Sequence, residues 1–467
     1  MLIHNKGKYM KTVQRPRVVI AGTNSGVGKT TIVAGLLAAY RQNGRVVQSF
    51  KVGPDYIDPG FHKMAAGRDS YNLDTWLVPP DKMIPFFESV TDSVDISIIE
   101  GVMGLYDGGR EGVSSTAEIA KRLAAPVVLV IDCKAMGESA AAIAKGFRDY
   151  DRNVNFAGVI LNRLGSENHE KMIRQGMEKV GIPIIGSIYR DNRMQSPERH
   201  LGLTPVTEFD PTEAIATIRD AVTSMVELDT LYRIAHSAPP LVSEPIIPTT
   251  TTEKVARIGV AYDEAFSFYY PASLAALEAT GAELVYFSPL KNAHLPEVDG
   301  LIFGGGFPEM FLGQLEANRS MKTDIKNKAL EGMPIYAECG GLMYLCQSIT
   351  DFENHTLEMV GVVPARTVME TSLQKVGYVT ATALKDSVIA HKNESLRGHE
   401  FHFSTMIPEV DDFPWAFQLV GGRKVQEYKG GYANGNVLAT YLHINFAGCD
   451  IARNHFVHAC VTYKHSK

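Results

Sequence analysis

The segment AGTNSGVGKTT, Ala21–Thr31, decides the fold of the first half of the chain. It follows the apolar run VVI and precedes the apolar segment IVAGLLAAY, which indicates a turn from a strand into a helix. Backbone N–H groups of such a glycine-rich turn point at phosphate oxygens, and the helix N-terminus adds positive potential. The segment therefore predicts a phosphate-binding loop, since a turn that only caps a helix does not require the order Gly-Val-Gly-Lys-Thr.

The residues of this loop are expected to bind ATP and its metal ion. Lys29 is expected to reach the terminal phosphates, and the Thr30 hydroxyl is expected to bind Mg²⁺. Asn162 follows a later apolar run, where its amide would read the adenine edge or cap a helix, and both alternatives stay open. The residues predicted to bind ATP are Thr23, Asn24, Ser25, Gly26, Val27, Gly28, Lys29, Thr30, Thr31 and Asn162.

Outward from the loop, short apolar runs alternate with longer helical patterns. The runs are RVVIAG, VVQSFKVG, ISIIEG, PVVLVID, FAGVILNR and PIIGSIY. Continuous apolar strands separated by helices are typical of an α/β fold whose parallel sheet is covered on both faces. A second α/β pattern starts at Arg257, and the region 350–435 contains short alternating segments that indicate antiparallel strands.

Changes in composition divide the chain into four predicted segments. A disordered leader is expected over residues 1–16, and the first α/β domain over 17–235. Residues 236–256 are rich in Pro, Ser and Thr, which predicts an extended linker. The second α/β domain is expected over 257–467.

Composition excludes several classes of protein. The 467 residues are 45% hydrophobic and 21% charged, with a formal net charge of -6, so no nucleic-acid partner is expected. No run is long enough for a signal peptide or a membrane span. The five cysteines form no metal-ligand spacing and their number is odd, which favours a reducing compartment, so we expect a soluble cytoplasmic protein.

Polar residues at the ends of apolar runs predict the rest of the first site. Glu100 ends ISIIE and is expected to hold Mg²⁺ with Thr30, although a solvated acid would fit the same position. In KVGPDYIDPGFH, Lys51 is expected to stabilise a transferred phosphoryl group and Asp55 to lie near the metal, unless this loop is only a turn-rich connection. The residues predicted to contact the substrate are Tyr56, Asp58, Asn72, Asp74 and Tyr106.

A thiol site is predicted in the second domain. YAECGGLMYL indicates strand, sharp turn and helix, with Cys339 at the turn, where a helix N-terminus stabilises a thiolate. Gly305 and Gly306 in FGGGF, with Gly340, are expected to form an oxyanion hole, and His443 in YLHINF to act as the general base. A buried sulfur is the alternative for Cys339, and it is the reading we adopt for Cys346.

The order of these motifs resembles the cobyrinic acid a,c-diamide synthases, which are glutamine-dependent amidases of corrinoid biosynthesis. The resemblance covers about residues 17–450 and rests on KVGPDYIDPGFH, NLDTW, EGVMGLYDG, ERHLGL and RGHEFHFS. It implies a P-loop domain similar to dethiobiotin synthetase and a C-terminal domain similar to class I glutamine amidotransferases. One departure from the MinD branch of P-loop proteins is Asn24, which stands where those proteins carry a signature lysine.

The resemblance also implies an activity. ATP, with Mg²⁺, would activate the a and c acetate carboxylates of cobyrinate as acyl phosphates, and glutamine would supply the ammonia. Class I amidotransferases usually carry His-x-Glu, whereas His443 is followed by Ile444 and Asn445. The resemblance therefore implies a Cys339/His443 dyad. The group that orients His443 stays open: Asn445, or an acid elsewhere such as Glu400.

Two other functions remain as alternatives. One is the same diamidation of nickel sirohydrochlorin in coenzyme F430 assembly. The other is a MinD-like ATPase switch, which would need a C-terminal amphipathic anchor. The sequence leaves a homodimer open.

Overall fold

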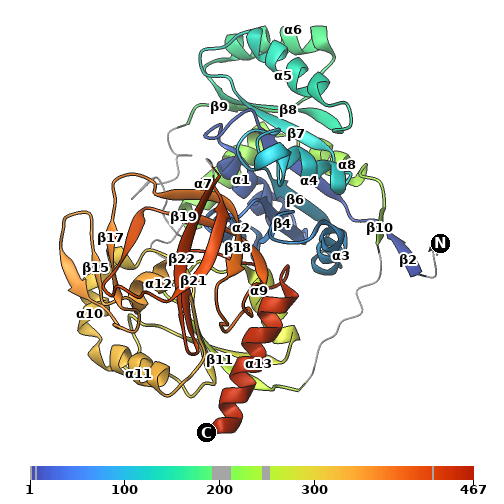
Figure 1. Cartoon of the computed structure of the whole chain (residues 1–467). Helices are drawn as coiled ribbons and strands as arrows, with labels where there is room; N and C mark the ends of the chain where they lie inside the picture. Colours follow the sequence, from blue (N-terminus) through green and yellow to red (C-terminus); the bar gives the residue numbers. More distant parts are fainter. Residues whose placement is uncertain (1–2, 6–7, 192–211, 244–252, 423–424) are drawn as a thin grey trace. The chain divides into compact units, whose positions relative to one another are not determined.

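The computed structural model describes residues 3–5, 8–191, 212–243, 253–422 and 425–467, and Figure 1 shows their course. They fold into two compact units, Met1–Ile247 and Pro248–Lys467, which we describe separately. The predicted linker spans the division, and its residues 244–252 lie outside the described residues. The motif at 198–203 also lies outside them.

Unit 1 is built on a seven-stranded parallel sheet. The strand order is β5-β4-β6-β3-β7-β8-β9, with every neighbouring pair parallel. This confirms the sheet that the alternating apolar runs predicted. The strands are β3 (Arg17–Gly22), β4 (Val47–Val52), β5 (Tyr71–Leu73), β6 (Ile96–Glu100), β7 (Val127–Asp132), β8 (Phe156–Leu164) and β9 (Ile184–Tyr189).

Helices cover both faces of this sheet, and each face has its own core. Along β3, Val18 and Ile20 pack under α1, α7 and α8, whereas Val19 and Ala21 pack under α3, α4, α5 and α6. Because successive strand residues point to opposite faces, a strand buried on both sides must be apolar throughout. The helices are α1 (Lys29–Gln42), α2 (Asp58–Ala66), α3 (Pro80–Val90), α4 (Thr116–Arg122), α5 (Ser139–Tyr150), α6 (Glu167–Val180), α7 (Thr212–Met225) and α8 (Leu228–His236).

The N-terminal segment differs from the prediction. Instead of a disordered leader over 1–16, a small antiparallel sheet of order β1-β2-β10 forms there. Backbone pairing with β10 and an ion pair of 2.6 Å between Lys11 and the buried Glu88 of α3 hold β2 in place. The three strands are β1 (Ile3–Asn5), β2 (Lys8–Val13) and β10 (Leu241–Ser243).

Unit 2 is built on a nine-stranded mixed sheet of order β12-β11-β13-β14-β23-β22-β21-β18-β19. The pairs from β12 to β23 are parallel and the others are antiparallel. The strands are β11 (Ala256–Ala261), β12 (Ala282–Phe287), β13 (Gly300–Phe303), β14 (Ile335–Glu338), β18 (Lys375–Ala383), β19 (Ser395–His402), β21 (Trp415–Gly421), β22 (Gln426–Asn434) and β23 (Val437–Thr440).

The region 350–435 supplies mostly antiparallel strands, as its alternating pattern predicted. Besides β18 to β22, it contributes to a four-stranded sheet of order β16-β15-β17-β20. These strands are β15 (Ser348–Thr350), β16 (Thr356–Glu358), β17 (Ala365–Met369) and β20 (Ser404–Pro408). The helices of unit 2 are α9 (Pro271–Ala279), α10 (Leu312–Ala317), α11 (Arg319–Leu330), α12 (Gly340–Leu345) and α13 (Asp450–Ser466). Among the described residues, no helix combines the length and apolarity needed to cross a membrane.

Candidate active sites

The predicted phosphate loop joins β3 to α1. Gly26 and Gly28 have φ angles of 80° and 93°, in the left-handed region that strains other residues. A Cβ at Gly28 would lie 2.5 Å from the Asn162 amide nitrogen, and a Cβ at Gly22 would lie 2.9 Å from Lys29 Nζ. The loop therefore needs glycine at Gly22 and Gly28, because side chains press against its backbone there.

Asn162 braces the loop from β8. Its amide donates a hydrogen bond of 2.8 Å to the carbonyl of Val27, and its oxygen accepts the N–H of Arg163. The nearest helix start is capped by Ser166 instead, so the helix-cap alternative for Asn162 is wrong. Adenine recognition by Asn162 stays a prediction.

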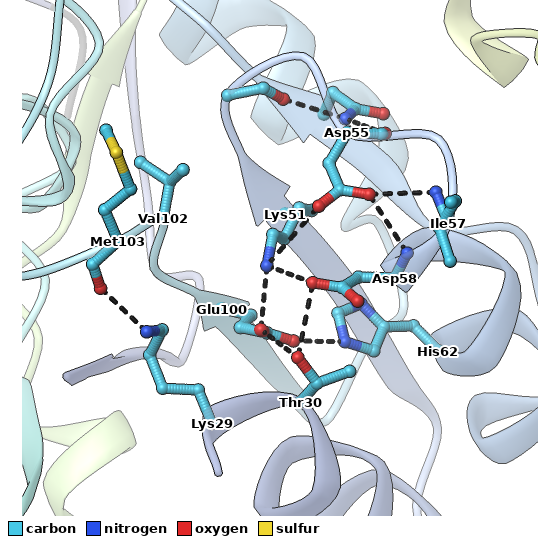
Figure 2. A network of polar contacts seen from close by, with 12 residues as sticks. Lys29, Thr30, Lys51, Asp55, Ile57, Asp58, His62, Glu100, Val102 and Met103 are labelled. Carbon is cyan, nitrogen blue, oxygen red and sulfur yellow. Dashed lines mark hydrogen bonds and ion pairs between the residues drawn. The ribbon is translucent and has the colours of Figure 1, made fainter. Parts of the chain in front are cut away.

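Lys29 is held by main-chain oxygens in this structure. Its ammonium donates to the carbonyl of Asn24 at 3.1 Å and to that of Met103 at 2.7 Å, as Figure 2 shows for Met103. Burial lowers the pKa of Lys29 to about 8. Asn24 and Ser25 are exposed at the start of the loop. The Lys29 ammonium thus lies within the loop, and its hydrogen bonds to two carbonyls are contacts that phosphate oxygens can replace.

A second cluster forms where β4 and β6 end. Lys51 and Glu100 are paired in the parallel register of these strands, and Lys51 Nζ lies 2.8 Å from Glu100 Oε1. The ammonium also donates to Asp58 at the start of α2. The Thr30 hydroxyl lies 2.7 Å from Glu100 Oε1 and 3.2 Å from Asp58 Oδ2, so four polar side chains converge (Figure 2).

The charges in this cluster fix each other. Burial alone would lower the pKa of Lys51, but the carboxylates of Asp58 and Glu100 raise it above its ordinary value. Burial alone would raise the pKa of Glu100, but Lys51 and His62 lower it well below its usual range. Burial and the neighbouring carboxylate of Asp55 raise the pKa of Asp58 to about 7. A cationic Lys51 and an ionised Glu100 are therefore the stable forms.

The two aspartates of the loop after β4 have different contacts. Asp58, predicted to contact substrate, lies on Thr30 and Lys51. Asp55, predicted to lie near the metal, accepts the N–H groups of Ile57 and Asp58, and its other oxygen is 3.8 Å from Lys51. Asp58, rather than Asp55, therefore contacts the Thr30 hydroxyl that is expected to bind Mg²⁺, and it shares the Lys51 ammonium with Glu100. Within the described residues, no three His, Cys, Asp or Glu side chains form a metal site on their own.

The other predicted substrate residues lie around the cluster with contacts of their own. Asn72 donates to the carbonyls of Gly53 and Asp55 and so shapes the loop that carries Tyr56. Asp74 accepts two backbone N–H groups and the hydroxyl of Ser114. The hydroxyl of Tyr106 donates to the carbonyl of Phe147 on α5. The structure does not bring Asp74 or Tyr106 onto Lys51.

In unit 2, Cys339 lies at a sharp turn between β14 and α12. Its backbone has φ 48° and ψ -104°, a rare conformation for a residue with a Cβ, and its N–H donates to the carbonyl of Thr440 on β23. Its thiol is hydrogen-bonded to the His443 side chain. Cys346 is fully buried in the core, as predicted. The structure thus brings the two predicted catalytic residues, Cys339 and His443, together. Their roles as nucleophile and base stay predictions.

Glycines pack against the turn that carries Cys339 and against His443. A Cβ at Gly340 would lie 3.1 Å from the Gly306 nitrogen, and a Cβ at Gly305 would lie 3.0 Å from His443 Cε1. The N–H of Gly341 donates to the carbonyl of Gly304, which joins the two loops. A side chain at Gly305 or Gly340 would therefore collide with its neighbours, and the oxyanion hole stays a prediction.

The group that orients His443 is neither of those expected. Asn445 accepts from the Ser273 hydroxyl and the Ala447 N–H, and Glu400 accepts from the Tyr428 hydroxyl. Instead, His443 Nδ1 lies 3.0 Å from Glu338 Oε2. The prediction that Asn445 or Glu400 contacts this nitrogen is therefore wrong. The acid that does so is Glu338, the residue directly before Cys339.

The charge of His443 gives a testable dependence of stability on pH. Burial alone would lower its pKa, but contacts with Cys339 and Glu338 raise the pKa of His443 to about 10. Since the ordinary value is about 6.5, this stabilisation is complete below about pH 6.5 and is lost as pH rises through about 10. We expect His443→Gln to lower the melting temperature by several degrees more at pH 7 than at about pH 10.5. The exposed His465→Gln should show no such trend, and an equal loss at both pH values would contradict the assignment.

Comparisons with known proteins match both halves of the chain. Residues 18–203 match the CobQ/CobB/MinD/ParA nucleotide binding domain, and residues 257–450 match the CobB/CobQ-like glutamine amidotransferase domain. The cobyrinate a,c-diamide synthase of Dehalococcoides mccartyi strain CBDB1 is 44% identical over 450 residues, 94% of this chain and 97% of that protein. That of Listeria innocua is 43% identical over 92% of this chain and 96% of its own length.

The chain belongs to the cobyrinate a,c-diamide synthase family. It is therefore an enzyme, a glutamine-dependent amidating ligase with a nucleotide-binding half and an amidotransferase half.

Two residues of these sites were not predicted from the sequence. The sequence did not single out Glu338, because class I amidotransferases usually carry this acid two positions after the histidine; its strand-end position in YAEC was the available signal. His62 is fully buried on α2, with Nε2 at 2.6 Å from Glu100 Oε2, and so fixes the second oxygen of that carboxylate. Its place in DPGFH, one helical turn after Asp58, was the available signal.

Proposed function

We propose that this chain amidates the a and c acetate carboxylates of cobyrinate, using ATP and glutamine. The observation that carries the proposal is the similarity to cobyrinate a,c-diamide synthases along 94% of the chain, with a phosphate loop in one unit and a hydrogen-bonded thiol and imidazole in the other. A carboxylate and ammonia do not condense usefully in water, so a ligase of this kind needs both an activating and an ammonia-releasing site.

The thiol site accounts for the release of ammonia. Cys339 Sγ attacks the side-chain amide carbon of glutamine, and N–H groups of Gly305, Gly306 and Gly340 stabilise the oxyanion. His443 gives a proton to the departing nitrogen as the C–N bond breaks. Water then hydrolyses the thioester to glutamate, returning the thiol.

The phosphate loop accounts for activation of the substrate. Lys29 and the loop N–H groups bind the phosphates of ATP, and a substrate carboxylate oxygen attacks the γ-phosphorus as ADP leaves. Lys51 compensates the charge of the transferred phosphoryl group. Ammonia attacks the carbonyl carbon of the acyl phosphate, and phosphate departs. Because the carboxylates hold Lys51 as a cation, it is charged before ATP arrives.

The donor set of the cluster fits Mg²⁺. Thr30, Asp58 and Glu100 offer hard oxygen ligands within one cluster, and the cluster already holds a cation, the Lys51 ammonium. A bound Mg²⁺ supplies charge compensation to the ATP phosphates. Of the predicted ligands, we retain Thr30 and Glu100, and we propose Asp58 in place of Asp55.

The substrate is tested by assaying the purified enzyme with cobyrinate and with nickel sirohydrochlorin. The names of the relatives favour cobyrinate. We expect a diamide from cobyrinate, with two ADP and two glutamate released per substrate, and at least about tenfold lower kcat/KM on the nickel macrocycle. Reactions without ATP should give no product. Faster turnover of nickel sirohydrochlorin would contradict the proposal, and ATP hydrolysis with no amidation of either macrocycle would favour the switch alternative.

A further inference from the structure

We propose that Glu338 is the positioning acid of the glutaminase site and acts on Cys339 through His443, an inference that rests on the proposed function. Its carboxylate accepts the Nδ1–H of His443 at 3.0 Å, and both side chains are largely buried. The opposite ring nitrogen, Nε2, is left for the thiol to which His443 is hydrogen-bonded. The three side chains therefore form one line from acid to imidazole to nucleophile.

The sheet explains why an acid at this position reaches a histidine 105 residues away. β14 and β23 are parallel neighbours, and Glu338 is paired with Thr440, three residues before His443. Cys339 follows Glu338 directly, and its positive φ turns the chain into α12. The acid and the nucleophile thus leave the same strand end, while the histidine leaves the neighbouring one.

The second oxygen of Glu338 is already committed. Glu338 Oε1 accepts the N–H of Ile444 at 3.1 Å and the hydroxyl proton of Tyr336. Two fixed donors on Oε1 leave Oε2 as the oxygen that faces His443. The carboxylate is consequently held in one orientation, and it requires a proton on Nδ1.

This polarity makes Glu338→Gln a sharp test. The glutamine oxygen would take the place of Oε1, because two donors point there, and its NH₂ group would face Nδ1. Nδ1 would then have to accept, and the imidazole proton would move to Nε2, where the ring can no longer take a proton from the thiol. A wrong tautomer of this kind costs about 10²- to 10⁴-fold in kcat.

Glu400 offers a matched control. It is also buried, and its carboxylate also accepts a tyrosine hydroxyl, that of Tyr428. Glu400→Gln therefore reproduces the loss of a buried charge beside a tyrosine, but without the contact to His443 Nδ1. Glu338→Asp keeps the charge and is expected to retain more activity than Glu338→Gln.

The experiment measures three quantities for each full-length variant: kcat and KM for glutamine hydrolysis, ammonium-dependent synthesis, and the ultraviolet absorbance of the thiolate at neutral pH relative to Cys339→Ala. For Glu338→Gln we expect a lower kcat with little change in KM, loss of the thiolate absorbance, and intact ammonium-dependent synthesis. Glu400→Gln should keep all three.

The inference would be overturned if Glu338→Gln kept the wild-type absorbance and kcat, or if Glu338→Gln and Glu400→Gln lost them equally. Loss of ammonium-dependent synthesis in Glu338→Gln would mark a structural role and would overturn it as well. Failure of the proposed function is separate, because it would show as glutamine-dependent synthesis that survives in Cys339→Ala.

Discussion

Replacing Cys339 by alanine is expected to abolish glutamine-dependent amidation while synthesis with high ammonium continues near the wild-type rate. In the proposed mechanism the Cys339 sulfur bonds to the glutamine carbon, and this thiol is the one hydrogen-bonded to His443. We expect glutamine hydrolysis to fall by about 10⁴-fold or more. Release of glutamate and of ADP, measured separately with each nitrogen source, checks this result.

Cys449→Ala is the matched control for this variant. Cys449 is a partly buried cysteine in no disulfide, in the same unit and at the start of α13. Both nitrogen sources should support its synthesis. If Cys339→Ala still used glutamine, the nucleophile assignment would be wrong; if it lost the ammonium reaction as well, the thiol would not be specific to the glutaminase half-reaction.

Replacing Lys29 by alanine is expected to remove synthesis with glutamine and with ammonium alike. Its ammonium lies in the phosphate loop, and the carbonyls of Asn24 and Met103 that hold it here cannot compensate phosphate charge. We expect a loss of about 10³-fold or more in ADP release, together with weaker binding of a fluorescent ATP analogue.

Lys121→Ala controls for loss of a lysine in the same unit. Lys121 pairs with Asp151 on the surface, and its removal should change neither ADP release nor nucleotide binding. Retained ammonium-dependent turnover in Lys29→Ala would contradict the assignment of the ATP site. A melting curve close to that of the wild type would show that the loss is not due to unfolding.

Much of the fold could be predicted because its strands are buried on both faces. A short apolar run such as VVLVID, between two helical patterns, is typical of a strand buried on both faces, and it predicted β7. The N-terminal strand β2 could not be predicted, because KYMKTV is polar and its pairing depends on β10, more than 220 residues later. Strands of this kind form because of partners that a local sequence pattern does not contain.

The site was predictable where one residue's chemistry suffices. Lys29, Glu100, Cys339 and His443 each stand at a strand or helix end with a motif around them. The contact of Glu338 with His443 depends on the register of β14 against β23, and register is a tertiary property. Similarly, Asp55 and Asp58 are equivalent in sequence, and only the fold of their loop shows which carboxylate reaches Thr30.

The pairing of β14 with β23 has a consequence for how amidotransferase domains are classified. A search that requires an acid two positions after the histidine would classify this domain as one that has lost the acid next to its histidine. Here the carboxylate of Glu338 reaches His443 from the end of β14, the parallel neighbour of the strand that precedes the histidine. An inactive relative is therefore better recognised by the absence of an acid at both strand ends than by the absence of an acid two positions after the histidine.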